Sequence, residues 1–180
     1  MRLASLSLEF EGDLVELGCY QGDTSLLLAE LLKGVKSEKR LWIYDSFEGL
    51  PEKTDADFSV AGAAFKKGEL FVTKRKVKLR FLRANLPIPM IKKGWFEDLD
   101  PEKDLPEKIC FAFLDGDLYQ SIKTSLGLIE NKMSEGGIIV VHDYDNPELP
   151  GVTKAVDEWL GKNNYKLSKK HTLAVLTCEC

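Results

Sequence analysis

A loop with two glycines near the N-terminus is the first place where this sequence could bind a ligand. It runs Leu14-Val15-Glu16-Leu17-Gly18-Cys19-Tyr20-Gln21-Gly22, an acidic strand end followed by glycines four residues apart. Glycine allows the backbone to approach a ligand closely, and the N–H groups at the start of a following helix can bind it. Because Cys19 and Tyr20 stand where a dinucleotide loop keeps small residues, the loop favours a nucleoside with a short charged tail. A tight strand-to-helix turn without a ligand is the alternative.

Asp45 is the second candidate, because it ends the next apolar stretch, Leu41–Asp45, and precedes Ser46. An acid about 20 to 30 residues beyond the glycine loop accepts hydrogen bonds from ribose hydroxyls in nucleotide-binding α/β folds. A carboxylate that only caps its own loop is the alternative. The presence of Glu16 and Gly18 on the preceding strand favours the ribose interpretation.

Polar residues also follow two later apolar stretches. Asp115 comes directly after one of them, and His142 and Asp143 lie at the end of the other. Because such strand ends lie side by side at the carboxyl edge of an open α/β sheet, these three side chains can converge. They would suit a divalent cation with open coordination positions. The alternative is that Asp115 and Asp117 cap the following helix while His142 and Asp143 only complete a turn.

Short β-type stretches alternate with helical ones along the whole chain, which predicts a parallel sheet with helices on both faces. The expected strands are Leu14–Leu17, Leu41–Asp45, Ile88–Ile91, Ile109–Leu114, Gly137–His142, Tyr165–Ser168 and Leu173–Thr177. The last two are too close together for a helical crossover and predict an antiparallel hairpin at the sheet edge. The fold class is therefore α/β, with the seven-stranded, mostly parallel, Rossmann-like sheet of class I methyltransferases. Residues 1–180 are expected to form a single domain.

Helical periodicity places the elements between these strands. Thr24–Lys33 is expected to be a helix with Asp23 as its N-cap. Apolar stripes within Tyr119–Met133 and Val152–Leu160 predict two further core helices.

Two segments between the strands are less regular. Phe65–Asn85 is strongly basic and predicts a solvated amphipathic helix. Its expected apolar face consists of Leu70, Phe71, Val77, Phe81 and Leu82. The irregular stretch Ser46–Ala64 is long for a loop, so we expect it to border the site.

Composition excludes several classes of protein. Of 180 residues, 44% are hydrophobic and 30% are charged, which is typical of a globular domain and not of a disordered or fibrous chain. A net charge of −4, without a basic stripe interleaved with aromatic residues, argues against a nucleic-acid partner. No apolar run approaches the roughly 18 residues of a membrane span, and no signal-peptide pattern opens the chain. We therefore expect a cytoplasmic protein with reduced cysteines.

The motifs together resemble the macrocin O-methyltransferase, or TylF-type, family, whose members are S-adenosylmethionine-dependent enzymes that methylate sugar hydroxyls of natural products. The matching segments are Gly12–Gly18 with Gly22, Asp45-Ser46-Phe47-Glu48-Gly49-Leu50-Pro51, Gly94-Trp95-Phe96-Glu97-Asp98, Leu114–Ser121 and Gly136–Tyr144. The glycine loop is common to many methyltransferases, whereas the later segments in this order are far more specific.

The resemblance implies a cofactor site. Glu16, Gly18 and Gly22 would line the methionine and ribose part of S-adenosylmethionine, Asp45 would hold the ribose hydroxyls, and Trp95 would lie near the adenine. The expected set of cofactor-binding residues is completed by Cys19, Ser46 and Asp115.

The resemblance also implies a metal site, in which Asp115 and Asp143 would bind Mg²⁺. From the residues of this chain we expect His142 as a third ligand of Mg²⁺ or Mn²⁺. Asp117, two residues past Asp115, is the expected general base, because a carboxylate beside the metal can take the hydroxyl proton, and Asp115 is also counted as catalytic. The family usually shows two adjacent carboxylates where this chain has His142-Asp143. An imidazole ligand favours a softer ion, such as manganese, iron or zinc, or no metal at all.

The expected acceptor is a small molecule with a free hydroxyl, a sugar or another polyhydroxylated compound. Two alternatives stay open: a metal-independent methyltransferase with His142 as the base, and an S-adenosylmethionine-binding module without catalysis. Family members have helical segments before the glycine loop that cover the cofactor and the acceptor, whereas this chain enters its first strand almost at once. We therefore expect an open site, a large substrate, or a cover supplied by another subunit of a homo-oligomer.

Overall fold

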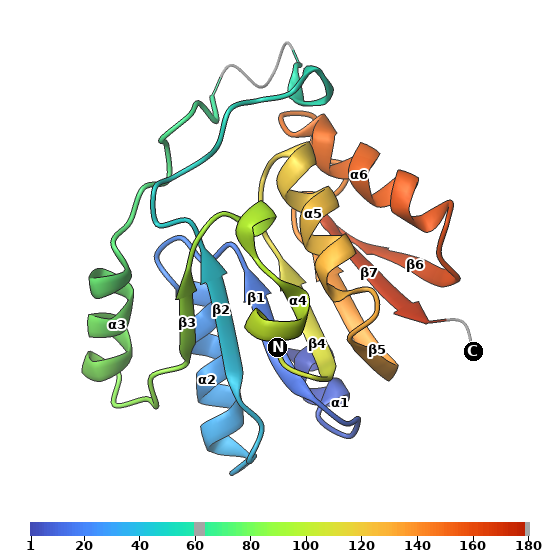
Figure 1. Ribbon diagram of the computed structural model, residues 1–180. Helices are drawn as coiled ribbons and strands as arrows, with labels where there is room; N and C mark the ends of the chain where they lie inside the picture. The colour runs from blue at the N-terminus through green and yellow to red at the C-terminus, as the bar shows by residue number, and fades with distance from the viewer. Residues whose placement is uncertain (60–63, 179–180) are drawn as a thin grey trace.

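A seven-stranded sheet forms the centre of the protein (Figure 1). The structure is a computed structural model and describes residues 1–59 and 64–178. The strands are β1 (Asp13–Leu17), β2 (Leu41–Asp45), β3 (Met90–Lys93), β4 (Ile109–Leu114), β5 (Met133–Val141), β6 (Tyr165–Lys170) and β7 (Leu173–Cys178). Their order in the sheet is β3-β2-β1-β4-β5-β7-β6. The strands β1 to β5 pair in parallel, while β7 runs antiparallel to both β5 and β6. The predicted mostly parallel sheet with a C-terminal antiparallel hairpin is confirmed.

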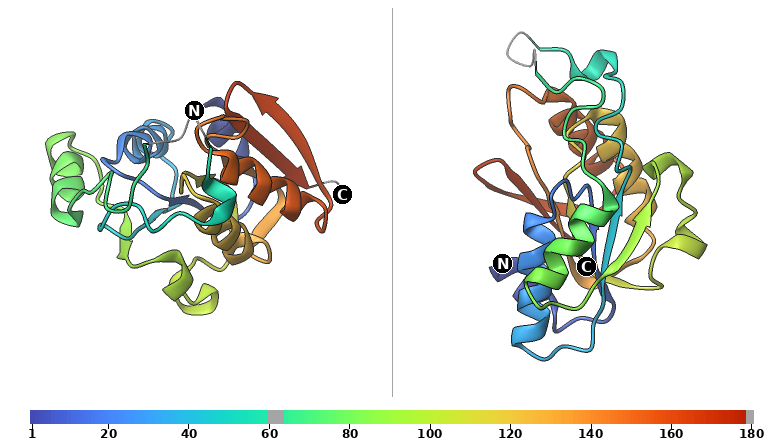
Figure 2. Two further views of the ribbon diagram at one scale, coloured as in Figure 1. Left: turned by 90° about the horizontal axis from the view of Figure 1, so that it is seen from above. Right: turned by 90° about the vertical axis from the view of Figure 1, so that its left-hand side faces the viewer.

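Helices cover both faces of this sheet (Figure 2). They are α1 (Arg2–Ser7), α2 (Asp23–Gly34), α3 (Lys74–Arg83), α4 (Pro101–Asp104), α5 (Tyr119–Ile129) and α6 (Pro150–Leu160), with short 3₁₀ turns at Asp55–Asp57 and Phe96–Asp98. One core cluster joins α5 and α6 to the sheet, and a second joins α1, α2 and α3 to the opposite face. Side chains alternate between the faces along a strand, so Val15 and Leu17 belong to the first cluster and Leu14 to the second.

The strand boundaries differ most from the predictions at β3 and β5. The edge strand β3 begins two residues later than the expected Ile88–Ile91, because the apolar Ile88 is exposed and precedes the strand, which continues into Lys92 and Lys93. Strand β5 begins at Met133, before the expected Gly137, and ends at Val141, so His142 lies in the loop just after it. Met133 therefore belongs to a strand and not to the stripe of α5.

The start of α2 also differs from its prediction. Its N-cap is Gly22, which has a left-handed backbone with φ of 81° and makes no side-chain capping bond. Asp23 is the first residue of the helix and pairs with Arg80 of α3 at 2.6 Å. Because only glycine adopts this φ at little cost, the chain turns from loop to helix at Gly22.

Helix α3 covers only part of the predicted Phe65–Asn85 helix. It starts after Thr73, whose side chain accepts a hydrogen bond from the backbone N–H of Lys76. The expected apolar face is partly wrong, because Phe71 and Leu82 are 60% and 59% exposed. Val77 and Phe81 are fully buried against the second cluster, while Leu70 turns toward the site.

The chain between β2 and α3 forms a long excursion over the carboxyl edge of the sheet. Its outgoing arm, residues 46–59, is called the strap below; it leaves β2 and crosses to the N-terminal ends of α5 and α6 (Figure 1). Gly62, which the sequence places in this loop, lies outside the described residues. None of the helices in the described part of the chain is long and apolar enough to cross a membrane.

Candidate functional site

The glycine loop and the start of the β4–α5 loop meet at the carboxyl edge of the sheet, where β1 and β4 are neighbours and the strand order reverses. Gly18, with φ of 89°, lies so close to the β4 end that a Cβ there would be 2.0 Å from the carbonyl oxygen of Asp115. The backbone N–H of Asp115 donates to the carbonyl of Leu17 at 2.9 Å. Position 18 thus requires a glycine, because any side chain there would collide with Asp115. The sequence alone did not reveal this requirement.

Asp45 connects this loop to the strap. One of its carboxylate oxygens accepts the backbone N–H groups of Cys19 and Tyr20 at 2.9 and 3.1 Å, and the other accepts that of Phe47 at 2.7 Å. The carboxylate therefore shapes its surrounding loops, as the structural alternative expected, and it also lines a pocket. A carboxylate has about four acceptor positions, so Asp45 can still accept a hydrogen bond from the hydroxyl of a ligand.

The pocket lies between the glycine loop, the end of β2, the strap, residues 94–97 and the loop after β4. Of the predicted cofactor residues, its wall contains Gly18, Asp45, Ser46, Trp95 and Asp115. A carboxylate beside an aromatic ring fits a nucleoside, whose ribose donates hydrogen bonds and whose base stacks.

Three of the predicted cofactor residues lie outside this wall. Gly22 caps α2, and Cys19 is buried beneath the loop. Glu16 is 1% exposed, on the face of β1 that α2 covers, and accepts a hydrogen bond from the hydroxyl of Ser25. Burial raises the pKa of Glu16 to about 8, against the lowering effect of the Ser25 bond. Its carboxyl group thus faces α2 and not the pocket.

Several residues of the wall were not singled out from the sequence. Tyr20 lies in the glycine loop, Leu50 and Pro51 in the strap, and Leu70 and Ser121 further along the chain. Tyr20, Leu50, Pro51 and Ser121 stand inside the quoted motifs, so the motifs were the signal that could have found them. Leu70 is brought in by the return of the chain, and no motif marks it as a site residue.

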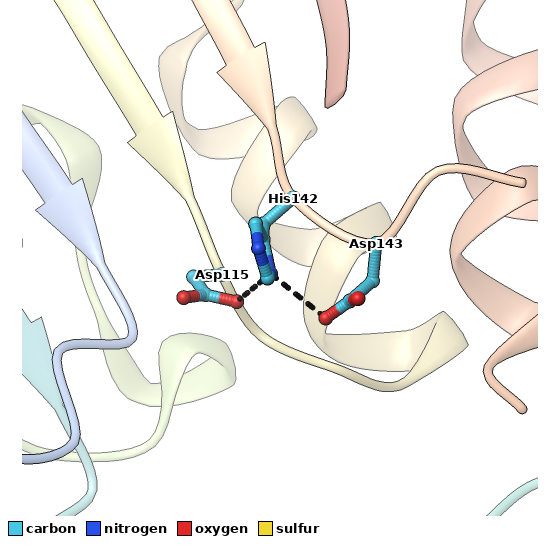
Figure 3. Close-up of side chains that lie close together, drawn as sticks. All are labelled: Asp115, His142 and Asp143. Carbon is cyan, nitrogen blue, oxygen red and sulfur yellow. Dashed lines mark hydrogen bonds and ion pairs between the residues drawn. The ribbon is translucent and has the colours of Figure 1, made fainter. Parts of the chain in front are cut away.

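Asp115, His142 and Asp143 do converge, as the sequence predicts (Figure 3). The Nδ1 atom of His142 lies 2.8 Å from Oδ2 of Asp143 and 3.1 Å from Oδ1 of Asp115. Asn146 donates to the other oxygen of Asp143 at 2.9 Å. Figure 3 shows the imidazole between the two carboxylates, one on the loop after β4 and one on the loop after β5.

These contacts alter the protonation of the group. Hydrogen bonds to Asp115 and then to Asp143 raise the pKa of His142 to about 10. Burial alone would raise the pKa of Asp143, but the hydrogen bonds from His142 and Asn146 outweigh it and lower that pKa. Without a metal, the imidazolium form therefore supplies the positive charge between the two carboxylates.

The same three side chains fit a divalent cation. Nδ1 of His142 lies 2.8 and 3.1 Å from the two carboxylate oxygens, and two ligand atoms bound to one ion at about 2.0–2.2 Å from it can be separated by such a distance. Two carboxylate oxygens and one imidazole nitrogen suit manganese, iron or zinc better than magnesium. A cation would take the place of the proton on Nδ1 of His142.

Asp117 lies beside this group in the pocket wall, with φ of 59°. Burial, followed by the charges of Asp115 and Asp143, raises the pKa of Asp117 to about 8. Its carboxylate accepts no hydrogen bond from any residue within 1–59 or 64–178. A carboxylate with a pKa close to neutral and no bound donor can accept a proton from a ligand.

Known proteins resemble this chain over most of its length. The sequence profile of the macrocin O-methyltransferase family (TylF) matches residues 6–172. The chain is 32% identical over 158 residues to the 8-demethyl-8-(2,3-dimethoxy-alpha-L-rhamnosyl)-tetracenomycin-C 4'-O-methyltransferase of Streptomyces olivaceus, covering 84% of this chain and 59% of that enzyme. It is 29% identical over 157 residues to the demethyldecarbamoylnovobiocin O-methyltransferase of Streptomyces niveus, with the same coverage of 84% and 59%. The chain thus spans about three fifths of the length of these relatives.

Solved structures show the same fold. The O-methyltransferase NovP superposes with a TM-score of 0.83 at 25% identity, covering 99% of this chain and 80% of NovP. The calicheamicin methyltransferase CalS11 superposes with a TM-score of 0.79 at 24% identity, covering 98% of this chain and 76% of CalS11. The profile match extends from α1 to the turn between β6 and β7 and includes every residue of the pocket wall. The chain belongs to the macrocin O-methyltransferase (TylF) family.

Proposed function

We propose that this chain is an S-adenosylmethionine-dependent O-methyltransferase that methylates a hydroxyl of a sugar or another polyhydroxylated small molecule with the help of a divalent cation. The observation that carries the proposal is the convergence of Asp115, His142 and Asp143 beside Asp117, at the rim of a pocket that contains Asp45 and Trp95. The first relative named above, whose name gives a rhamnosyl-bearing tetracenomycin C as its acceptor, supports the sugar as acceptor class.

The cofactor would occupy the pocket between the glycine loop and the strap. Asp45 would accept hydrogen bonds from the ribose hydroxyls, Trp95 would lie against the adenine, and Gly18 and Ser46 would leave room for the chain that carries the sulfonium. Glu16, Cys19 and Gly22 would act from behind the wall, by shaping the loop. Leu50 and Pro51 of the strap would exclude water from the methyl group.

Asp115, His142 and Asp143 would hold the cation, and the acceptor would enter beside them. Bound S-adenosylmethionine supplies an electrophilic methyl group, and a bound divalent cation lowers the pKa of a hydroxyl and fixes its orientation. Asp117 would accept the hydroxyl proton while the oxygen–methyl bond forms and the sulfur–carbon bond breaks. The electron pair of the broken bond stays on sulfur, which gives S-adenosylhomocysteine.

The test is calorimetric titration of S-adenosylmethionine into the purified chain, after chelation and again with added Mn²⁺. Incubation with a panel of polyhydroxylated glycosides then follows methyl transfer by mass spectrometry. The proposal expects cofactor binding in both titrations and a product 14 Da heavier than one of the acceptors, formed only with the metal. No heat and no thermal shift at saturating cofactor would exclude it, while binding without turnover on any acceptor would favour a module without catalysis.

A metal-independent reaction is the second candidate, favoured by the position of His142 Nδ1 within 3.1 Å of both carboxylates. In that case no cation is bound, and His142 is the base, whose neutral form takes the proton of the acceptor hydroxyl. Asp115→Asn would then leave activity nearly intact and a chelator would have no effect. The cation-assisted reaction predicts the opposite result in both experiments.

A further inference from the structure

Asp57 is a buried acidic residue that does not belong to the pocket wall, and nothing in the proposed chemistry uses it. It ends the 3₁₀ turn of the strap and is only 1% exposed. One carboxylate oxygen accepts hydrogen bonds from the N–H and the hydroxyl of Thr54 at 2.8 and 2.7 Å. The other accepts the backbone N–H of Tyr119 at 2.6 Å, across 62 positions of sequence. A buried carboxylate is costly unless fully hydrogen-bonded, so its position is strongly constrained.

The contact with Tyr119 joins the strap to the site. Tyr119 is the first residue of α5, and its N–H is one of the groups that the helix itself leaves without an acceptor. Asp117 stands two residues earlier and Asp115 four residues earlier, on the same loop. The negative charge of Asp57 at this helix end is also favourable, because the N-terminal end of a helix carries a partial positive charge.

Gly151, on a third element, packs against the contact between Asp57 and Tyr119. It lies in the first turn of α6, and a Cβ at this position would be 2.0 Å from Oδ1 of Asp57 and 2.8 Å from Cβ of Tyr119. Helix α6 follows the loop that starts with His142 and Asp143. The strap, the loop after β4 and the loop after β5 therefore meet at the Asp57 carboxylate.

The base of the strap is held separately. Leu50 exchanges backbone hydrogen bonds with Glu69 and Gly68 of the returning arm, both at 2.9 Å. Leu50 and the following Pro51 lie in the wall of the pocket. Beyond Leu50, two exposed contacts also reach the returning arm: Glu52 pairs with Lys67 at 3.1 Å, and Lys53 donates to the carbonyl of Ala64 at 2.7 Å. Loss of the far attachment at Asp57 would leave the strap held only by these contacts near its base.

We propose that Asp57 is a positioning residue, which holds the strap over the pocket and fixes the N-terminal end of α5 and with it Asp117. The proposal rests on the proposed function, because it gives the strap the task of enclosing the cofactor. Asp57 touches neither cofactor nor acceptor and acts through Tyr119, Thr54 and the strap.

The test compares four variants with the wild-type chain. Asp57→Ala removes the carboxylate hydrogen bonds to Thr54 and Tyr119, Asp57→Asn keeps the acceptor for the N–H of Tyr119, and Gly151→Ala displaces the carboxylate by steric contact without changing the sequence of the strap. Gly161→Ala, in which the new Cβ would have its nearest neighbour at 3.6 Å, is the control at the other end of α6. Each variant is analysed by amide hydrogen exchange and by calorimetric titration with S-adenosylhomocysteine.

We expect Asp57→Ala and Gly151→Ala to speed exchange of the Tyr119 amide and of residues 47–59 by about tenfold or more, the behaviour of a segment that opens locally. They should weaken S-adenosylhomocysteine binding by a factor of about ten, the loss of one good contact. Asp57→Asn should restore most of the Tyr119 protection and of the affinity, a rescue that a general loss of stability would not show. Gly161→Ala should match the wild type in both readouts.

Unchanged exchange of the strap and of Tyr119 in folded Asp57→Ala or Gly151→Ala would overturn the proposal, as would an equal effect of Gly161→Ala. If Asp57→Ala does not fold, Gly151→Ala and Asp57→Asn decide by the same criteria. If the wild type itself does not bind S-adenosylhomocysteine, the proposed function fails, while the exchange data still report whether Asp57 holds the strap.

Discussion

At the scale of single residues, the environments of the two acids after β4 assign them different tasks. Asp115 contacts the imidazole of His142, whereas Asp117 has no hydrogen-bond partner within the described chain and a pKa raised to about 8 by burial and by neighbouring acids. Near neutral pH a group of this kind can accept a proton and release it again. The first acid is thus suited to hold a cation and the second to move a proton.

Substitution of Asp117 tests this division. Asp117→Asn should lower kcat by roughly 10²–10⁴-fold, the usual contribution of a general base, and leave cofactor affinity close to that of the wild type. Steady-state rates and calorimetry measure the two effects. Asp145→Asn, which changes a partly exposed acid paired with Lys169 at 2.6 Å, is the control and should retain kcat. A kcat within threefold of the wild type in Asp117→Asn would assign the proton transfer to another group.

Glu16 gives a prediction on pH. Because burial raises its pKa in the folded state to about 8 from the ordinary 4.5, the folded protein binds the proton more tightly than the unfolded chain does. The stabilisation that the bound proton provides to the folded state is complete below pH 4.5 and is lost as the pH rises to about 8. Glu16→Gln, which carries no charge, should be more stable than the wild type by up to roughly 4 kcal/mol above pH 8. The difference should vanish near pH 4.5.

Urea unfolding of both proteins at a series of pH values from 4.5 to 9 measures this difference. A difference that stays constant across the series would show that the Glu16 carboxyl group does not change its protonation on folding. Glu97→Gln, a change of an exposed carboxylate of the pocket rim, serves as the control and should leave the pH dependence unaltered.

The site residues that could be predicted from the sequence are those that lie at the end of a strand. Asp45, Asp115 and His142 lie at the carboxyl edge because they terminate apolar stretches, and the pairing of the strands brings them together. Glu16 stands one residue before its strand end, so the pleat turns it to the face of α2. Asp57 could not be found, because its partner Tyr119 is 62 positions away and no local pattern marks the contact.

At the scale of elements, the buried strands were the most predictable part of the fold. Strands β1, β4 and the second half of β5 are covered on both faces, and β4 and Ile138–Val141 read as continuous apolar runs. The edge strand β3, with exposed side chains, was displaced by two residues in the prediction. Helix α3 was overestimated because Leu70 and Phe71 continue its apolar pattern, although Leu70 packs toward the pocket and Phe71 toward solvent.

Gly18 illustrates how one element constrains another. Gly18→Ala should destabilise the protein by about 1–3 kcal/mol from its left-handed backbone alone, with a further cost from the 2.0 Å approach to Asp115. It should also weaken cofactor binding, because β1 and β4 must separate at the pocket. Gly127→Ala, on the exposed side of α5, should instead stabilise by roughly 0.5–1 kcal/mol. Thermal unfolding of both variants is the measurement, and equal melting temperatures would contradict the prediction.

At the scale of the whole molecule, a cation bound at the proposed site would couple folding to ligand binding, because Asp115 follows β4 whereas His142 and Asp143 follow the neighbouring strand β5. Mn²⁺ at 100 times its Kd should stabilise the folded protein by about 2.7 kcal/mol and raise Tm accordingly. The gain should be absent after chelation and much reduced in Asp143→Asn. An unchanged Tm of the wild type with Mn²⁺ would favour the form in which the imidazolium of His142 bridges the two carboxylates.

The two edge strands of the sheet limit how copies of this chain can associate. Strands β3 and β6 are its open edges, and both expose lysines: Lys92 and Lys93 on one, Lys166, Lys169 and Lys170 on the other. Charged edges of this kind disfavour the addition of a further strand, since each added strand would bring cation against cation. The protein is thereby protected from growing into an extended sheet. A second copy that covers the pocket would have to approach through helices or loops.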